Sequence, residues 1–165
     1  MYRKSFEGMN CSVACALEQV GEWWSLLIVH ECTLGVTRFD EFQRRLGIAR
    51  NVLTSRLNTL IGHGILEKVT ADECEKRLCY RLTPKGEALY PVLVALMQWG
   101  DAWNGHAAPI QLVAKDSGQP IDPVGLRAQG GELLGLRDIR VEAGPGATPA
   151  TVETVQARNK AILRE

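Results

Sequence analysis

The 165-residue sequence lacks the features that mark membrane and secreted proteins. It holds no apolar run approaching the ~20 residues needed to span a bilayer and no secretory segment, so we expect a cytoplasmic protein with no membrane partner. None of its five cysteines lies beyond Cys79, and in that compartment we expect reduced thiols. The length suits one domain of ordinary size with room for a smaller appendage.

Catalytic and metal-binding motifs are missing as well. The three histidines, His30, His63 and His106, are isolated, and the sequence holds no HExxH motif, no paired CxxC, no nucleophile elbow and no phosphate-binding loop. A histidine without such partners is more often a surface or helix-end residue than a ligand or a base. We therefore expect no enzyme activity, no bound metal and no cofactor.

The sequence does contain an ordered series of short amphipathic segments between residues 39 and 81. Phe39, Phe42 and Leu46 recur at i, i+3 and i+7, which predicts a helix with one apolar face. Gly47 supplies a sharp turn, and a second helix from Ala49 places leucines inward until two glycines near residue 63 end it. Strand-like runs at 65–70 and 78–82 follow, with a polar tip at 71–77. This order is that of a winged helix-turn-helix, which predicts duplex DNA as the partner.

The outward face of the second helix has the chemistry of a base-reading surface. Its members are short and polar, and they can donate or accept hydrogen bonds, which suits base edges in a major groove. They are Arg50, Asn51, Thr54, Ser55 and Asn58.

Charge distribution points the same way, although 19 basic and 19 acidic residues give a net charge of zero. Between Phe42 and Leu66 the chain carries four arginines, namely Arg44, Arg45, Arg50 and Arg56, and no acid. A compact basic surface neutralises phosphates, so this cluster predicts DNA affinity. The alternative is that these arginines only form a solvent-exposed helix surface and contact no DNA.

Helices are also expected on both sides of this core motif. The sequence predicts one helix from a Ser12 cap to about Gly21, a second over 24–34, and a long helix that starts at Thr83-Pro84 and runs to Trp103. The apolar surface of the long helix is too wide for one small core, so part of it is expected to meet another subunit.

Beyond His106 the composition changes, with more Gly and Pro and short alternating runs at 110–113 and 133–141 that suggest hairpins. A last helix is expected from Thr148-Pro149. We predict an α+β, mainly α protein. Residues 1–106 would form a winged helix-turn-helix domain for DNA binding and dimerisation. Residues 107–165 would form a small C-terminal β-hairpin unit with a terminal helix.

The segments FDEFQRRL, IARNVLTSRLNTLIGHGILEK, YRLTPKGEAL and WGDAW resemble, in this order, the HxlR family of bacterial winged-helix transcription regulators, relatives of the MarR type. The resemblance implies a homodimer, assembled through the first and last helices of the winged domain, that binds a roughly palindromic operator and regulates a neighbouring gene. We expect this regulator to act as a repressor. It places the recognition helix at 49–61 and the wing at 71–77. The candidate DNA-binding residues are Arg44, Ala49, Arg50, Asn51, Thr54, Ser55, Arg56, Lys76 and Arg77. The competing class is a small-molecule or protein-binding winged-helix module without DNA affinity.

Cys11 stands at the family's N-terminal cysteine, which in several members senses electrophiles or oxidants. A position next to a helix N-terminus favours the thiolate that such chemistry requires, so Cys11 is the candidate redox sensor. The alternative is plain packing. An electrophile, an oxidant or another small molecule is the expected effector. Cys32, in contrast, is expected in the core.

Overall fold

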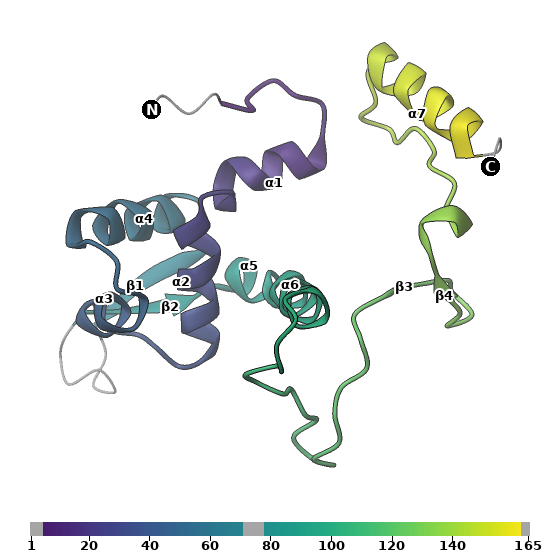
Figure 1. The fold of residues 1–165 in the computed structure, drawn as a ribbon. Helices are drawn as coiled ribbons and strands as arrows, with labels where there is room; N and C mark the ends of the chain where they lie inside the picture. Colours follow the sequence, from purple (N-terminus) through teal and green to yellow (C-terminus); the bar gives the residue numbers. More distant parts are fainter. Residues whose placement is uncertain (1–4, 71–77, 163–165) are drawn as a thin grey trace.

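The computed structural model describes residues 5–70 and 78–162, and Figure 1 shows their course. In chain order the elements are α1 (Ser12–Val20), α2 (Trp23–Thr33), α3 (Phe39–Leu46), α4 (Arg50–Gly62), β1 (Leu66–Thr70), β2 (Leu78–Leu82), α5 (Pro84–Glu87), α6 (Tyr90–Trp103), β3 (Leu126–Arg127), β4 (Leu133–Leu134) and α7 (Pro149–Ile162). The predicted α+β, mainly α class is confirmed. Within the described ranges no helix is both long and apolar enough to cross a membrane.

The core lies where α2, α3 and α4 gather against the β1–β2 hairpin (Figure 1). The hairpin is antiparallel and pairs Leu66 with Leu82 at one end and Thr70 with Leu78 at the other. The central side chains are fully or almost fully buried; they are Ile28, Val29, Phe42, Leu53, Leu57, Leu60, Ile65 and Leu66. Tyr80 packs edge-on against Phe42, with ring centroids 6.3 Å apart. These inward positions are the ones that the helical periodicity predicts for α3 and α4.

The turn between α3 and α4 depends on Gly47. This residue has φ 63° and ψ 19°, and its N–H donates to the Gln43 carbonyl at 3.0 Å. Helices commonly end at a residue in the left-handed conformation, and glycine adopts this conformation at little energetic cost. The predicted helix-turn-helix is therefore confirmed.

The region after the hairpin begins as predicted but then departs from the prediction. Thr83 caps α5, because its Oγ1 accepts from the Gly86 N–H at 3.2 Å, and Pro84 occupies the first turn. However, the expected single long helix is split into α5 and α6. Pro91 has no N–H to donate to the carbonyl four residues earlier, that of Glu87, which is where α5 ends.

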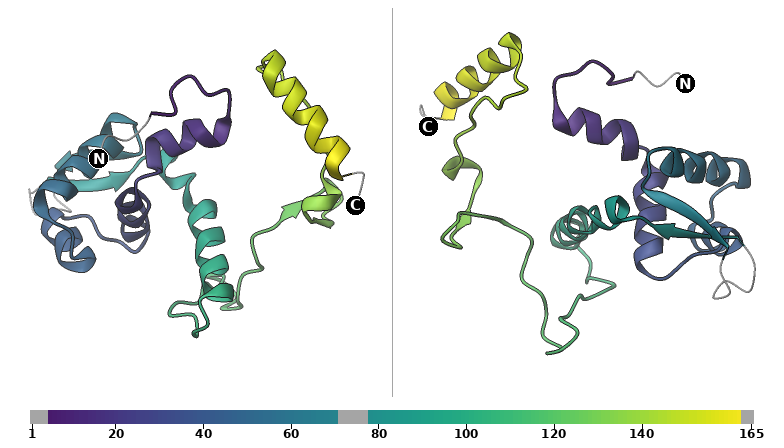
Figure 2. Two further views of the ribbon diagram at one scale, coloured as in Figure 1. Left: turned by 45° about the horizontal axis from the view of Figure 1, so that its top comes forward. Right: turned by 180° about the vertical axis from the view of Figure 1, so that it is seen from behind.

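In the C-terminal arm, defined as residues 107–162, the part around β3 and β4 stands apart from the winged domain in all three views (Figures 1 and 2). Gly118 and Gly131 have positive φ and turn two short hairpins, as predicted. The hairpins are shorter than the alternating runs suggested: the first is one bridge between Val113 and Pro120, and the second pairs only β3 with β4. No described side chain between residues 107 and 161 is buried. The arm therefore has no hydrophobic core of its own.

Candidate nucleic-acid interface

The exposed face of α4 carries the polar residues that the sequence places there. Arg50, Asn51, Thr54, Ser55 and Asn58 are all exposed. The helix begins after Ala49, which has extended backbone angles and provides no side-chain cap, and no acidic residue lies in the first turn. The first N–H groups of an α-helix have no partner within the helix and attract anions such as phosphate. The start of α4 is thus suited to approach a DNA backbone.

Arg50 is held in position by an aromatic ring from the preceding helix. Its guanidinium carbon lies 4.9 Å from the centroid of the Phe39 ring. Cation–π contacts of this kind contribute about 0.5–1 kcal/mol at exposed sites. The hydroxyl of Thr54 donates to the Arg50 carbonyl at 2.8 Å on the same face. The sequence predicts Phe39 only as a core residue, because nothing in the spacing shows that its ring meets α4.

The basic cluster is less concentrated than the sequence suggests. Arg44 is well exposed and lies 3.9 Å from Glu41, its neighbour one turn earlier on α3. Arg45 instead pairs with the largely buried Glu31 of α2, and the hydrogen bond to this carboxylate raises the pKa of Arg45. One of the four arginines is therefore used to join α3 to α2.

Arg56 also makes an ion pair that the sequence does not predict. Its guanidinium lies 3.2 Å from Glu22, and only a quarter of its side chain is exposed. This pair links α4 to the N-terminal end of α2, because Glu22 is the residue before that helix. The DNA contact expected of Arg56 stays a prediction: its side chain is partly exposed, and its charge is partly offset by Glu22.

The predicted wing, residues 71–77, lies between β1 and β2 in the sequence. The Tyr80 N–H donates to the Thr37 carbonyl at 2.8 Å, so the segment before α3 is bonded to β2 and fixes the hairpin beside the helix-turn-helix. The predicted wing contacts, Lys76 and Arg77, lie outside the described residues. The described part thus shows the base of the wing and its attachment.

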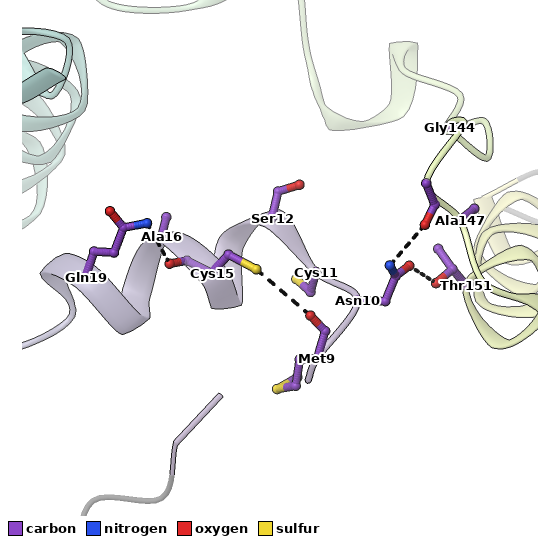
Figure 3. A pocket seen from close by; sticks show the side chains of 11 residues that line it. Met9, Asn10, Cys11, Ser12, Cys15, Ala16, Gln19, Gly144, Ala147 and Thr151 are labelled. Carbon is purple, nitrogen blue, oxygen red and sulfur yellow. Dashed lines mark hydrogen bonds between the residues drawn. The ribbon is translucent and has the colours of Figure 1, made fainter. Parts of the chain in front are cut away.

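A second site lies at the start of α1, where an open cavity of about 600 Å³ separates this helix from the start of α7 (Figure 3). Cys11 and Cys15 are both exposed and line it. Asn10 bridges its two sides, since its amide nitrogen donates to the Gly146 carbonyl at 3.0 Å and its oxygen accepts from the Thr151 hydroxyl at 2.6 Å. No charged side chain lines the cavity among the described residues.

The cysteines differ sharply in their surroundings. Cys11 is the residue that precedes the first turn of α1, so the predicted cap at Ser12 is wrong by one position, and no side chain caps the helix. Burial, together with the nearby Glu31 carboxylate, raises the pKa of Cys32 to about 12. Cys79 is disulfide-bonded, against the expectation that all the thiols are reduced. Cys11 and Cys15 are thus the accessible thiols of the described chain.

Two helices joined by a left-handed turn, with a polar face on the second helix and a hairpin after it, define a winged helix-turn-helix protein. The family model described as HxlR-like helix-turn-helix matches residues 19–108. Over 143 residues the chain is 41% identical to uncharacterized HTH-type transcriptional regulators of Mycobacterium tuberculosis and Mycobacterium bovis, covering 86% of this chain and 89% of theirs.

Solved structures give the same result. PA1607, named as a candidate transcription factor, shares 42% identity with a TM-score of 0.77, and the match covers 86% of this chain and 100% of that one. The transcriptional regulator YodB from B. subtilis, solved in its reduced form, shares 30% identity with a TM-score of 0.50 and covers 59% of this chain and 97% of its own. The chain belongs to the HxlR-like helix-turn-helix family and is a DNA-binding transcriptional regulator of the winged-helix type.

Proposed function

We propose that this protein is a homodimeric repressor that binds a roughly palindromic operator in the cytoplasm and has no enzyme activity. In each subunit α4 would enter the major groove, and Arg50, Asn51, Thr54 and Ser55 would contact base edges. Ala49 would approach the backbone, Arg44 and Arg56 would contact flanking phosphates, and the wing at 71–77 would do the same through Lys76 and Arg77. Residues 1–106 would form the unit that binds DNA and dimerises, and residues 107–165 the appendage.

The observation that carries the proposal is the position of Arg50. An exposed Arg50 in the first turn of α4, held against the Phe39 ring, supports this proposal, because recognition helices contact bases through residues near their N-terminus. A side chain that is already oriented loses less entropy on binding than a free one, so this contact favours specific recognition.

Apolar stripes on two helices support the dimer. On α6 the exposed side chains of Val92, Leu96, Trp99 and Trp103 recur at helical spacing, and on α1 Val13 and Leu17 do the same. Trp99 is 64% exposed and Trp103 75%. Exposed aromatic side chains in such a stripe are typical of a protein interface. The first and last helices of the winged domain are thus the surfaces we assign to the dimer.

One observation favours the competing function, a winged-helix module without DNA affinity. Arg45 and Arg56 are both paired with carboxylates, so less positive charge faces outward than the sequence suggests. Electrostatic attraction to phosphate supplies most non-specific DNA affinity. Binding to DNA must then depend strongly on Arg44, Arg50 and the wing.

The test begins with selection of a duplex from a random library by the full-length protein. Binding of the selected duplex is then measured for the parent, for Arg50→Ala and for Lys115→Ala, which removes an exposed cation from the arm. We expect Arg50→Ala to cost about 1–3 kcal/mol and to relax specificity at one position of each half-site. Lys115→Ala should bind like the parent. Equal binding by all three proteins, or no selected sequence, would contradict the proposal.

We propose Cys11 as the thiol through which an electrophile or oxidant controls DNA binding. Its exposure before α1 and the cavity that it shares with Cys15 support this assignment, as does the similarity to YodB, which was solved in a form named for its redox state. A quinone or diamide should release operator DNA from the parent, whereas Cys11→Ser should bind DNA and ignore the reagent. Release of DNA from Cys11→Ser as well would assign the response to another group.

A further inference from the structure

The single chain exposes far more surface than a folded protein of its mass. Its accessible surface is 12355 Å² for 18.2 kDa, whereas the usual scaling for folded monomers gives about 8,100 Å². Even if each of the fourteen residues outside the described ranges took the roughly 160 Å² of an unfolded residue, about 2,000 Å² of the excess would remain. An excess of this size matches one partner's share of a large, permanent interface.

Much of this surface is apolar and belongs to the C-terminal arm. The large exposed side chains there are Ile110, Val113, Ile121, Val124, Leu126, Leu133 and Leu136, of which Leu126, Leu133 and Leu136 are the most exposed, at 62%, 60% and 76%. An isolated two-stranded hairpin is at best marginally stable in water. The arm therefore needs a partner surface to hold these side chains out of solvent.

The arm is hydrogen-bonded to its own winged domain at two separated places. Near α6, the Val124 N–H donates to the Gln98 side chain at 2.7 Å. Near α1, Asn10 bonds Gly146 and Thr151 at the start of α7. Leu126, Leu133 and Leu136 lie between these two attachments. Figures 1 and 2 show this part of the arm standing apart from α1 and α6.

We propose that the arm is an intersubunit clamp: the apolar side chains around β3 and β4 of each chain pack against the exposed stripes of α1 and α6 in a second copy of the chain. The occupant is a second copy because one chain carries both the apolar arm and the exposed stripes of α1 and α6. In a pair of chains, the arm of each can therefore cover the stripes of the other. The arm also leaves directly from the end of α6, beside the dimer surface assigned above. A net charge of zero adds no overall repulsion between copies.

This inference rests on the proposed homodimer and deepens it, because it assigns the arm of the second copy as the surface that covers the stripes of α1 and α6. Its first test is the mass in solution of a full-length variant with Leu126→Glu, Leu133→Glu and Leu136→Glu. The control variant carries Gln111→Glu, Gln119→Glu and Gln129→Glu, three exposed positions of the same arm that add the same charge. Both sets are exposed in one chain, so neither should unfold it. Light scattering should report half the parent's mass for the leucine variant only; a dimer that survives both would overturn the clamp.

A second test asks which chain the arm touches. A benzophenone amino acid replaces Leu136 in a tagged chain that is co-expressed with a parent chain bearing a different tag. Irradiation should give a product that carries both tags, with the crosslink in α1 or α6 of the second chain. Crosslinks found only within one chain would overturn the clamp. Binding of the parent to its selected duplex is measured in parallel, so loss of the clamp and loss of the proposed DNA binding give separate results.

Discussion

The clearest consequence for stability concerns Gly86, in the short helix that follows the wing hairpin. A Cβ added to this residue would lie 2.2 Å from the Ile65 carbonyl oxygen and 2.9 Å from a methyl carbon of Leu82. The carbonyl cannot retreat freely, because it accepts the Thr83 N–H at 3.1 Å. Gly86→Ala must therefore shift α5 away from β1.

The cost can be estimated from what such a shift breaks. It would weaken the Thr83 hydrogen bond, worth about 0.5–1.5 kcal/mol, and overpack the site, which typically costs about 1–3 kcal/mol. We expect Gly86→Ala to lose about 3 kcal/mol of unfolding free energy, measured by urea denaturation followed by circular dichroism. Gly62→Ala is the control, because its Cβ would meet no atom within 4 Å and its φ is not positive. A Gly86→Ala protein within about 0.5 kcal/mol of the Gly62→Ala protein would refute the reasoning.

Three further outcomes follow from single contacts. Thr83→Ala should lose about 1 kcal/mol of stability, as for other helix caps, and Thr83→Ser should recover most of it in the same denaturation assay. Cys32 should resist alkylation in the folded protein, because a pKa of about 12 instead of 9.0 lowers the thiolate fraction about a thousandfold near neutral pH; rapid labelling by iodoacetamide would contradict the burial. Phe39→Leu should weaken binding of the selected duplex by about 0.5–1 kcal/mol through loss of the ring under Arg50, and unchanged affinity would show that the ring does not orient it.

Local patterns in the sequence predict most of the winged domain. Apolar spacing places α3 and α4 within a residue of their observed bounds, and Gly47 marks the turn between them. Thr83 is predicted as a cap from its place before Pro84. These features depend on neighbours in the chain, so a periodicity argument can find them. The interruption of the helix near Pro91 is local as well. The apolar residues on both sides of Pro91 nevertheless suggested one continuous helix.

The contacts that shape the candidate site depend on residues far apart in the sequence. Arg56 meets Glu22, and Arg45 meets Glu31, only because α2 packs beside α3 and α4. A count of arginines in a window therefore overestimates the charge available to DNA. The arm also could be predicted only in part. Its glycines mark the turns of the hairpins, but no local pattern shows that the hairpins have no hydrophobic core within the same chain.

The most direct test of the central claim, that α4 of a two-fold dimer contacts operator bases, is a base-by-base substitution scan of the selected duplex with the parent and Arg50→Ala proteins. The account predicts two symmetric half-sites whose centres lie about one DNA turn, roughly 34 Å, apart. Arg50→Ala should lose discrimination at one matching position in each half-site and keep it elsewhere. A single asymmetric site, or an Arg50→Ala profile identical to that of the parent, would contradict the account.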